Sequence, residues 1–148
     1  MDAQLFIPEL VLLAGALLAF GLTLFQVSPK TQRAAAVAAS VAFTAACFWT
    51  LPLQGSLFFD AYRVDLFSQL VKCSMGLGFV LLLFFGADLK GITGNVRGEY
   101  YLFMITSLLG LTFLVSSVEL ITLFISLELS SYSLYLLVPM RCPGHKQR

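Results

Sequence analysis

Five long apolar spans that are almost free of charge constrain this 148-residue chain more than any other feature. They cover residues 10–25, 34–51, 66–87, 100–118 and 120–140, and the only charged residues inside them are Lys72 and Glu128. A helix needs roughly 20 apolar residues to cross a bilayer core about 30 Å thick. Because lipid offers no partners for free backbone N–H and C=O groups, each span must be helical. The spans therefore predict an all-α, polytopic membrane protein with five transmembrane helices.

The composition excludes several soluble classes. Apolar residues make up 59% of the chain and charged residues 11%, whereas soluble domains carry about 25% charged residues. Net charge is only +1 and no basic cluster precedes the last eight residues, so nucleic acid is not an expected partner. A secretory signal peptide would need an early basic region, but the first basic residue is Lys30. The lipid bilayer is the partner that this composition predicts.

The distribution of Lys and Arg predicts the orientation. The connections at 26–33 and 88–99 and the tail from 141 hold seven of these residues, whereas the N-terminus, the 52–65 connection and the turn at 119 hold only Arg63. Basic loops stay in the cytoplasm. We therefore expect the N-terminus outside and the C-terminus in the cytoplasm.

No motif for a metal, cofactor or nucleophile is present in the sequence. Cys47, Cys73 and Cys142 form no C-x-x-C pair, and the single histidine is His145 in the tail. P-loop and dinucleotide-binding glycine patterns do not occur either. We expect this chain alone to bind no cofactor or metal and to carry no catalytic residue.

Glu128 lies too deep in its span for its short side chain to reach the interface, at about 12 Å along a helix that rises about 1.5 Å per residue. Ser131, Tyr132 and Tyr135 follow at i+3, i+4 and i+7, so hydroxyl groups extend from the carboxylate along one face. Intramembrane acids often mark proton relays, and this pattern predicts a proton pathway. The alternative is a protonated carboxyl that only hydrogen-bonds to another helix.

Lys72 allows a different interpretation because it lies near the outer end of its span. Asp65, Ser68 and Gln69 share its face of the helix, at i−7, i−4 and i−3. A lysine stem can reach the membrane interface from such a position. We expect Lys72 to be an interfacial anchor or the ion-pair partner of Asp65.

The segment from Glu99 to Val138, EYYLFMITSLLGLTFLVSSVELITLFISLELSSYSLYLLV, resembles helices four and five of a known family. This family is the antiporter-like N subunit (chain 2 type) of proton-pumping NADH:quinone oxidoreductase, respiratory complex I. PELVLL from Pro8 and RVDLFSQL from Arg63 resemble the family's first helix and its entry into helix three, so the resemblance covers nearly all of residues 5–140. The matching motif positions are Glu99, Tyr101, Gly110, Leu123, Phe124, Leu127, Glu128 and Leu129.

The resemblance implies a subunit of a proton-translocating NADH:quinone oxidoreductase in the bacterial inner membrane, with the other membrane subunits as partners. In that family the helix-five glutamate, here Glu128, is thought to pair with a lysine two helices further on. Electron transfer to quinone changes such pairings and drives proton translocation. Flavin, iron–sulfur clusters and quinone are expected in other subunits.

The resemblance also implies a division of the chain. Residues 1–99 would form an N-terminal three-helix group and 100–140 the first two helices of the proton-channel module. The tail at 141–148, RCPGHKQR, departs from the family's continuation, so we expect a truncated or frame-shifted product or one piece of a split subunit. The alternatives are a subunit of a related cation/proton antiporter or membrane-bound hydrogenase, and a non-pumping membrane scaffold.

Overall fold

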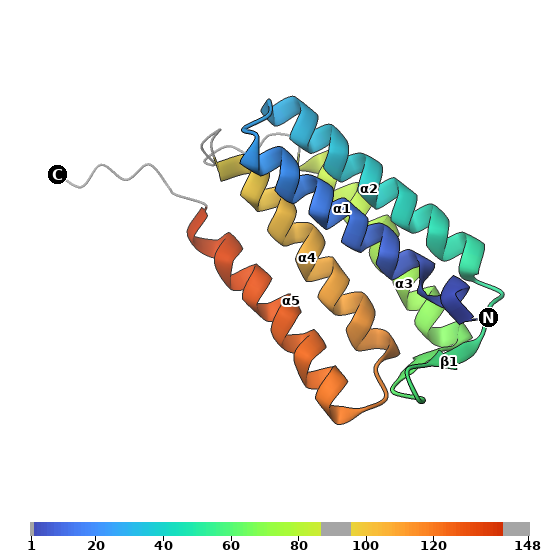
Figure 1. The fold of residues 1–148 in the computed structure, drawn as a ribbon. Coiled ribbons are helices and arrows are strands. Elements are labelled where there is room, and N and C mark those ends of the chain that lie inside the picture. Colours follow the sequence, from blue (N-terminus) through green and yellow to red (C-terminus); the bar gives the residue numbers. More distant parts are fainter. Residues whose placement is uncertain (1, 87–95, 141–148) are drawn as a thin grey trace.

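In residues 2–86 and 96–140, which the computed structural model describes, five α-helices lie side by side in an elongated bundle (Figure 1). The helices are α1 (Ile7–Leu24), α2 (Pro29–Thr50), α3 (Leu66–Phe85), α4 (Arg97–Ser116) and α5 (Leu120–Met140), and a short 3-10 helix, η1 (Asp2–Phe6), precedes them. All five α-helices are long and apolar enough to cross a membrane. The predicted five-helix architecture is confirmed.

The first helix begins earlier than the sequence predicted. Pro8 lies in the first turn of α1, where a missing N–H costs nothing, and the helix starts at Ile7 rather than near residue 10. Glu9 is therefore part of the helix and is buried there. The predicted span at 10–25 began one residue after Glu9, so the sequence analysis did not count Glu9 among the charges inside the apolar helices.

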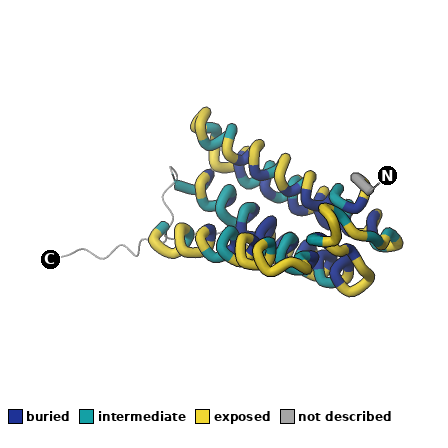
Figure 2. The backbone as a smooth tube through the Cα atoms, turned by 60° about the horizontal axis from the view of Figure 1, so that its bottom comes forward, coloured by how far each residue is buried: buried dark blue, intermediate teal, exposed yellow. Residues whose placement is uncertain are grey.

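The core lies between α1, α2, α3 and α4, and α5 packs along α4 at one side of the bundle (Figure 1). Leu12, Phe43 and Ile105 are almost completely buried in this core. In α5 the three buried side chains are all serines, Ser126, Ser130 and Ser133. Exposed residues consequently dominate α5, whereas buried residues line the inner sides of the other helices (Figure 2).

A β-hairpin that the sequence did not predict covers one end of the bundle. Strands β1 (Gly55–Leu57) and β2 (Tyr62–Val64) pair antiparallel, with Gly55 opposite Val64 and Leu57 opposite Tyr62. The side chains of Tyr62 and Val64 are buried and that of Arg63 between them is exposed. The expected all-α fold therefore carries a small strand pair within the 52–65 connection.

The hairpin is tied to the end of α4. Tyr62 forms an isolated bridge with Ser117, and the backbone N–H of Val118 donates to the carbonyl of Ala61 at 3.0 Å. The turn of the hairpin, Phe58 to Asp60, adopts positive φ angles of 55°, 57° and 67°, which L-residues other than glycine adopt at a cost. The hairpin thus joins the first three helices to the α4–α5 pair.

Candidate functional site

Glu128 lies on the part of α5 that does not pack into the bundle. The seam with α4 consists of small residues, and Ser130 Oγ lies 3.3 Å from Ser107 Oγ across it. Glu128 is half-buried on the side of α5 that faces away from this seam. Among residues 2–86 and 96–140 it forms no hydrogen bond or ion pair. Its carboxyl group is available to a group outside the described residues.

The other members of the predicted pathway extend from Glu128 along the same side of α5. Ser131 is half-buried, while Tyr132 and Tyr135 are 60% and 70% exposed. We call this side, Glu128, Ser131, Tyr132 and Tyr135, the outer face of α5. Because α4 is the only described helix with extensive contacts to α5, these hydroxyls line no enclosed passage between described helices.

Lys72 occupies a buried site with two partners that the sequence did not suggest. Its ammonium Nζ lies 2.8 Å from Glu9 Oε1, and both side chains are fully buried. Lys72 Nζ also donates to the Tyr62 hydroxyl at 2.8 Å, and this hydroxyl donates to Glu9 Oε1 at 2.6 Å. Glu9, Tyr62 and Lys72 form a closed set of three contacts, which we call the buried triad. Lys72 is therefore an ion-pair partner, but in the described residues its partner is Glu9 and not Asp65.

Asp65, the expected partner of Lys72, instead caps α3. Its Oδ1 accepts from the backbone N–H of Ser68 at 2.7 Å, and Ser68 Oγ accepts from the backbone N–H of Asp65 at 2.9 Å. This reciprocal capping box satisfies two N–H groups at the start of the helix. The backbone N–H of Ser68 also lowers the pKa of Asp65, since it favours the charged carboxylate. Asp65 is exposed and its role is local.

Three elements bring the buried triad together. Glu9 lies in the first turn of α1, where the helix dipole favours a negative charge. Lys72 lies in the second turn of α3. Tyr62 points between them because alternate residues of β2 face the bundle. The sequence signal for this site was an acid just before the first apolar span and a lysine inside the third.

Aromatic rings surround the Tyr62 side of the triad. The rings of Phe6, Phe113 and Phe58 lie with their centroids 5.7, 6.2 and 6.4 Å from that of Tyr62. Burial, followed by the negative charge of Glu9, raises the pKa of the Tyr62 hydroxyl. Tyr62 consequently remains a phenol and donates to Glu9. The Lys72 ammonium lies 5.1 Å from the Tyr62 ring centroid, within the range of a cation–π contact.

Two buried polar atoms close to the triad lack a partner in the described structure. They are Glu9 Oε2 and Ser116 Oγ, and Ser116 is 2% exposed at the end of α4. The Ser116 side chain lies near enough to Tyr62 to affect its hydroxyl. Both orphaned atoms thus lie around the same tyrosine.

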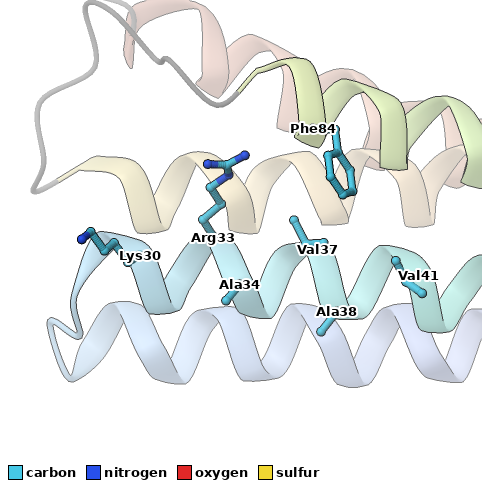
Figure 3. A pocket seen from close by; sticks show the side chains of 7 residues that line it. All are labelled: Lys30, Arg33, Ala34, Val37, Ala38, Val41 and Phe84. Carbon is cyan, nitrogen blue, oxygen red and sulfur yellow. The ribbon is translucent and has the colours of Figure 1, made fainter.

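A groove of about 580 Å³ lies between α2 and α3 (Figure 3). Lys30 and Arg33 lie at one end of it, and the rest of its lining is apolar. The apolar lining residues are Ala34, Val37, Ala38, Val41 and Phe84. In the described part of the chain, no three His, Cys, Asp or Glu side chains gather as they would around a metal ion. Cys142 and His145 lie outside the described residues.

The fold and these sites define a multi-pass helical bundle with ionisable groups placed among apolar helices. Comparison with curated proteins identifies the family. The chain is 45% identical over 143 residues to NADH-quinone oxidoreductase subunit N 2 of Opitutus terrae, a match that covers 97% of this chain and 30% of the relative. It is 38% identical to subunit N 2 of Syntrophobacter fumaroxidans and 34% identical to subunit N of a Geobacillus species, over 95% and 93% of its own length.

The chain belongs to the family of subunit N of NADH-quinone oxidoreductase, as its motifs predicted. It spans about 30% of the length of these curated relatives. No family model matches the chain. No solved structure matches it either.

Proposed function

We propose that this chain forms the N-terminal part of a membrane subunit of NADH-quinone oxidoreductase and contributes to proton translocation coupled to electron transfer from NADH to quinone. The observation that carries the proposal is the similarity to subunit N over 97% of the chain, together with an intramembrane acid in its fifth helix. The names of the relatives favour this function over a cation/proton antiporter or a hydrogenase subunit.

Glu128 is the proton-carrying acid in this proposal. Its carboxyl group has no partner among the described residues and lies on the outer face of α5, next to Ser131 and ahead of Tyr132 and Tyr135. Relatives are about three times as long as the region that this chain matches, and further helices would cover this face. A cationic side chain on such a helix would titrate together with Glu128, so that a change at one group alters proton affinity at the other.

We also propose a location, an orientation and partners for the chain. The chain would lie in the bacterial inner membrane, with its N-terminus outside and its C-terminus in the cytoplasm. Other membrane subunits of the complex would be its partners. Flavin, iron–sulfur clusters and quinone would be bound by other subunits, and this chain would contribute no catalytic residue.

The test compares two acids of the same chain in the assembled oxidoreductase complex. Glu128→Gln removes the titratable group and keeps its size, and Glu119→Gln makes the same change in the exposed turn before α5. We expect Glu128→Gln to reduce NADH-driven proton translocation by about tenfold or more, with the complex still assembled, and Glu119→Gln to leave it unchanged. Full translocation in the Glu128→Gln complex would instead favour a non-pumping scaffold.

A further inference from the structure

We propose that the buried triad, together with Ser116, is a hydrated proton-exchange site. In this site one water molecule binds between Glu9 Oε2 and Ser116 Oγ, and the Tyr62 hydroxyl relays protons between Glu9 and Lys72. The site involves α1, α3, α4 and the hairpin and does not include Glu128. It therefore stands whether or not the outer face of α5 carries protons.

The two orphaned atoms indicate the water. Among the described residues, Glu9 Oε2 and Ser116 Oγ are buried without a hydrogen-bond partner, and a buried polar atom that forms no hydrogen bond is costly. Polar atoms of this kind are commonly satisfied by an ordered water. A buried water needs two to four polar partners. Glu9 Oε2 would accept a hydrogen bond from the water, and the Ser116 hydroxyl would form a second hydrogen bond with the same water.

The hydrogen bonds of the triad run in one direction, as a relay requires. Lys72 Nζ donates to the Tyr62 hydroxyl, which donates in turn to Glu9 Oε1. The two links are 2.8 and 2.6 Å long, so no rearrangement is needed before a proton moves. Glu9 then has one oxygen facing the relay and one oxygen that faces the proposed water.

The proton transfer starts from the ion pair, with Glu9 as a carboxylate and Lys72 as an ammonium. Lys72 Nζ gives a proton to the Tyr62 hydroxyl, and Tyr62 gives its own hydroxyl proton to Glu9 Oε1. One N–H bond of Lys72 breaks and one O–H bond forms on Glu9, so both groups become neutral and Tyr62 keeps its charge. Rotation of the neutral carboxyl group brings this proton to the water, which takes it and returns one of its own. The reverse transfer through Tyr62 restores the ion pair, with one proton of Lys72 exchanged.

In this proposal, solvent reaches the site from the hairpin end of the bundle. A polar pocket of about 650 Å³ lies against the hairpin and includes Arg63, Val64 and Asp65 in its lining. Tyr62 and Val64 turn their side chains inward from the same strand. The buried Cys47 thiol of α2 is a further titratable group within electrostatic range of both Glu9 and Lys72.

The experiment measures hydrogen–deuterium exchange of the Lys72 ammonium in the full 148-residue chain in lipid nanodiscs. Lysine nitrogens are labelled with ¹⁵N and followed by NMR after transfer to D₂O, and the backbone amide of the buried Ile105 serves as the slow reference. Tyr62→Phe removes the relay hydroxyl and keeps the ring. Ser116→Val removes the second partner of the water and fills its space. Neither variant leaves Lys72 without Glu9.

Thr112→Val is the matched control. Thr112 is fully buried on α4, one turn before Ser116, and its hydroxyl bonds only within its own helix, to the carbonyl of Leu109 at 2.8 Å. We expect Lys72 in the wild type and in Thr112→Val to exchange about tenfold or more faster than the Ile105 amide, which opens only with the core. Exchange should slow by about tenfold or more in Ser116→Val, which removes the water. It should slow less in Tyr62→Phe, where Lys72 Nζ still contacts Glu9 Oε1 directly.

Two results would overturn the proposal. Lys72 in the wild type could exchange as slowly as the Ile105 amide, which would show a sealed ion pair. Alternatively, Lys72 could exchange equally fast in all variants, which would show another route. The slow exchange of Ile105 in every variant is the check that the bundle remains folded.

Discussion

At the scale of single residues, the buried triad is the most demanding feature of the chain. Two opposite charges lie 2.8 Å apart with fully buried side chains. Desolvation of such a pair is expensive, and the attraction between the charges offsets this cost only while both partners are present. Tyr62 adds a hydrogen bond to each partner. The stability of the first three helices should therefore depend on the balance of the triad more than on any single member.

Removing one charge of the triad should lower the free energy of unfolding more than removing both charges. We expect Lys72→Met to lower the free energy of unfolding by about 3–5 kcal/mol, because it leaves Glu9 buried without a counter-charge. The double variant Glu9→Gln with Lys72→Met should recover most of this loss. The free energies of unfolding of both variants can be measured in mixed lipid–detergent micelles by adding a denaturing detergent. Lys30→Met, at an exposed site, is the control and should change little.

At the scale of elements, small residues determine how α5 meets α4. A Cβ at Gly110 would lie 2.6 Å from the backbone N of Ser130 and 3.0 Å from the carbonyl oxygen of Ser126. Helices in lipid gain stability from such close backbone approach. Any side chain at Gly110 would push α5 away from the bundle, because both contact atoms belong to the backbone.

Gly110→Ala should consequently loosen the α4–α5 pair. We expect a loss of about 1–3 kcal/mol in unfolding free energy, the usual cost of overpacking. Gly78→Ala is the matched control, because a Cβ at Gly78 meets nothing within 4 Å. Gly78→Ala should gain up to about 1 kcal/mol from helix propensity. The two variants are compared by thermal unfolding in nanodiscs. Equal stability of Gly110→Ala and Gly78→Ala would contradict close packing at Gly110.

The sequence predicted elements better than it predicted sites. The five helices followed from apolar length, since nothing but a helix satisfies the backbone in lipid. The triad could not be predicted in the same way, because Glu9 preceded the apolar run and its partner Lys72 is distant in sequence. Tyr62 depended on a hairpin of two three-residue strands, too short to give a clear alternating pattern. Asp65 looked like a partner on helical spacing, but its side chain turns back to cap the helix.

At the scale of the whole molecule, the two ends of the bundle differ in charge. The α1–α2 connection is followed by Lys30 and Arg33, whereas the hairpin end has Asp60 and Asp65 beside Arg63. Basic segments stay on the cytoplasmic side of a membrane. The hairpin, the polar pocket and the nearby triad would then face the outside.

This orientation can be tested by labelling single cysteines in intact bacterial cells. A background chain with Cys47, Cys73 and Cys142 changed to alanine receives one cysteine, either Ser56→Cys in the hairpin or Ser28→Cys before α2. Both positions are exposed. A membrane-impermeant maleimide should label the Ser56→Cys chain from outside and the Ser28→Cys chain only after the cells are opened. The reverse pattern would invert the proposed topology.

The separation of Glu9 and Lys72 along the chain also governs biosynthesis. A lone ionisable residue raises the free energy of inserting a helix into the bilayer, by up to about 3 kcal/mol for a charge at the helix centre. The ribosome adds about 5–20 residues per second, so the roughly 60 residues between the partners take several seconds to synthesise. During that delay α1 carries an unpaired carboxyl group. We therefore expect the first helix to reach its final position only after the third has entered the bilayer, so that the order in which the helices leave the ribosome becomes part of how this protein enters the membrane.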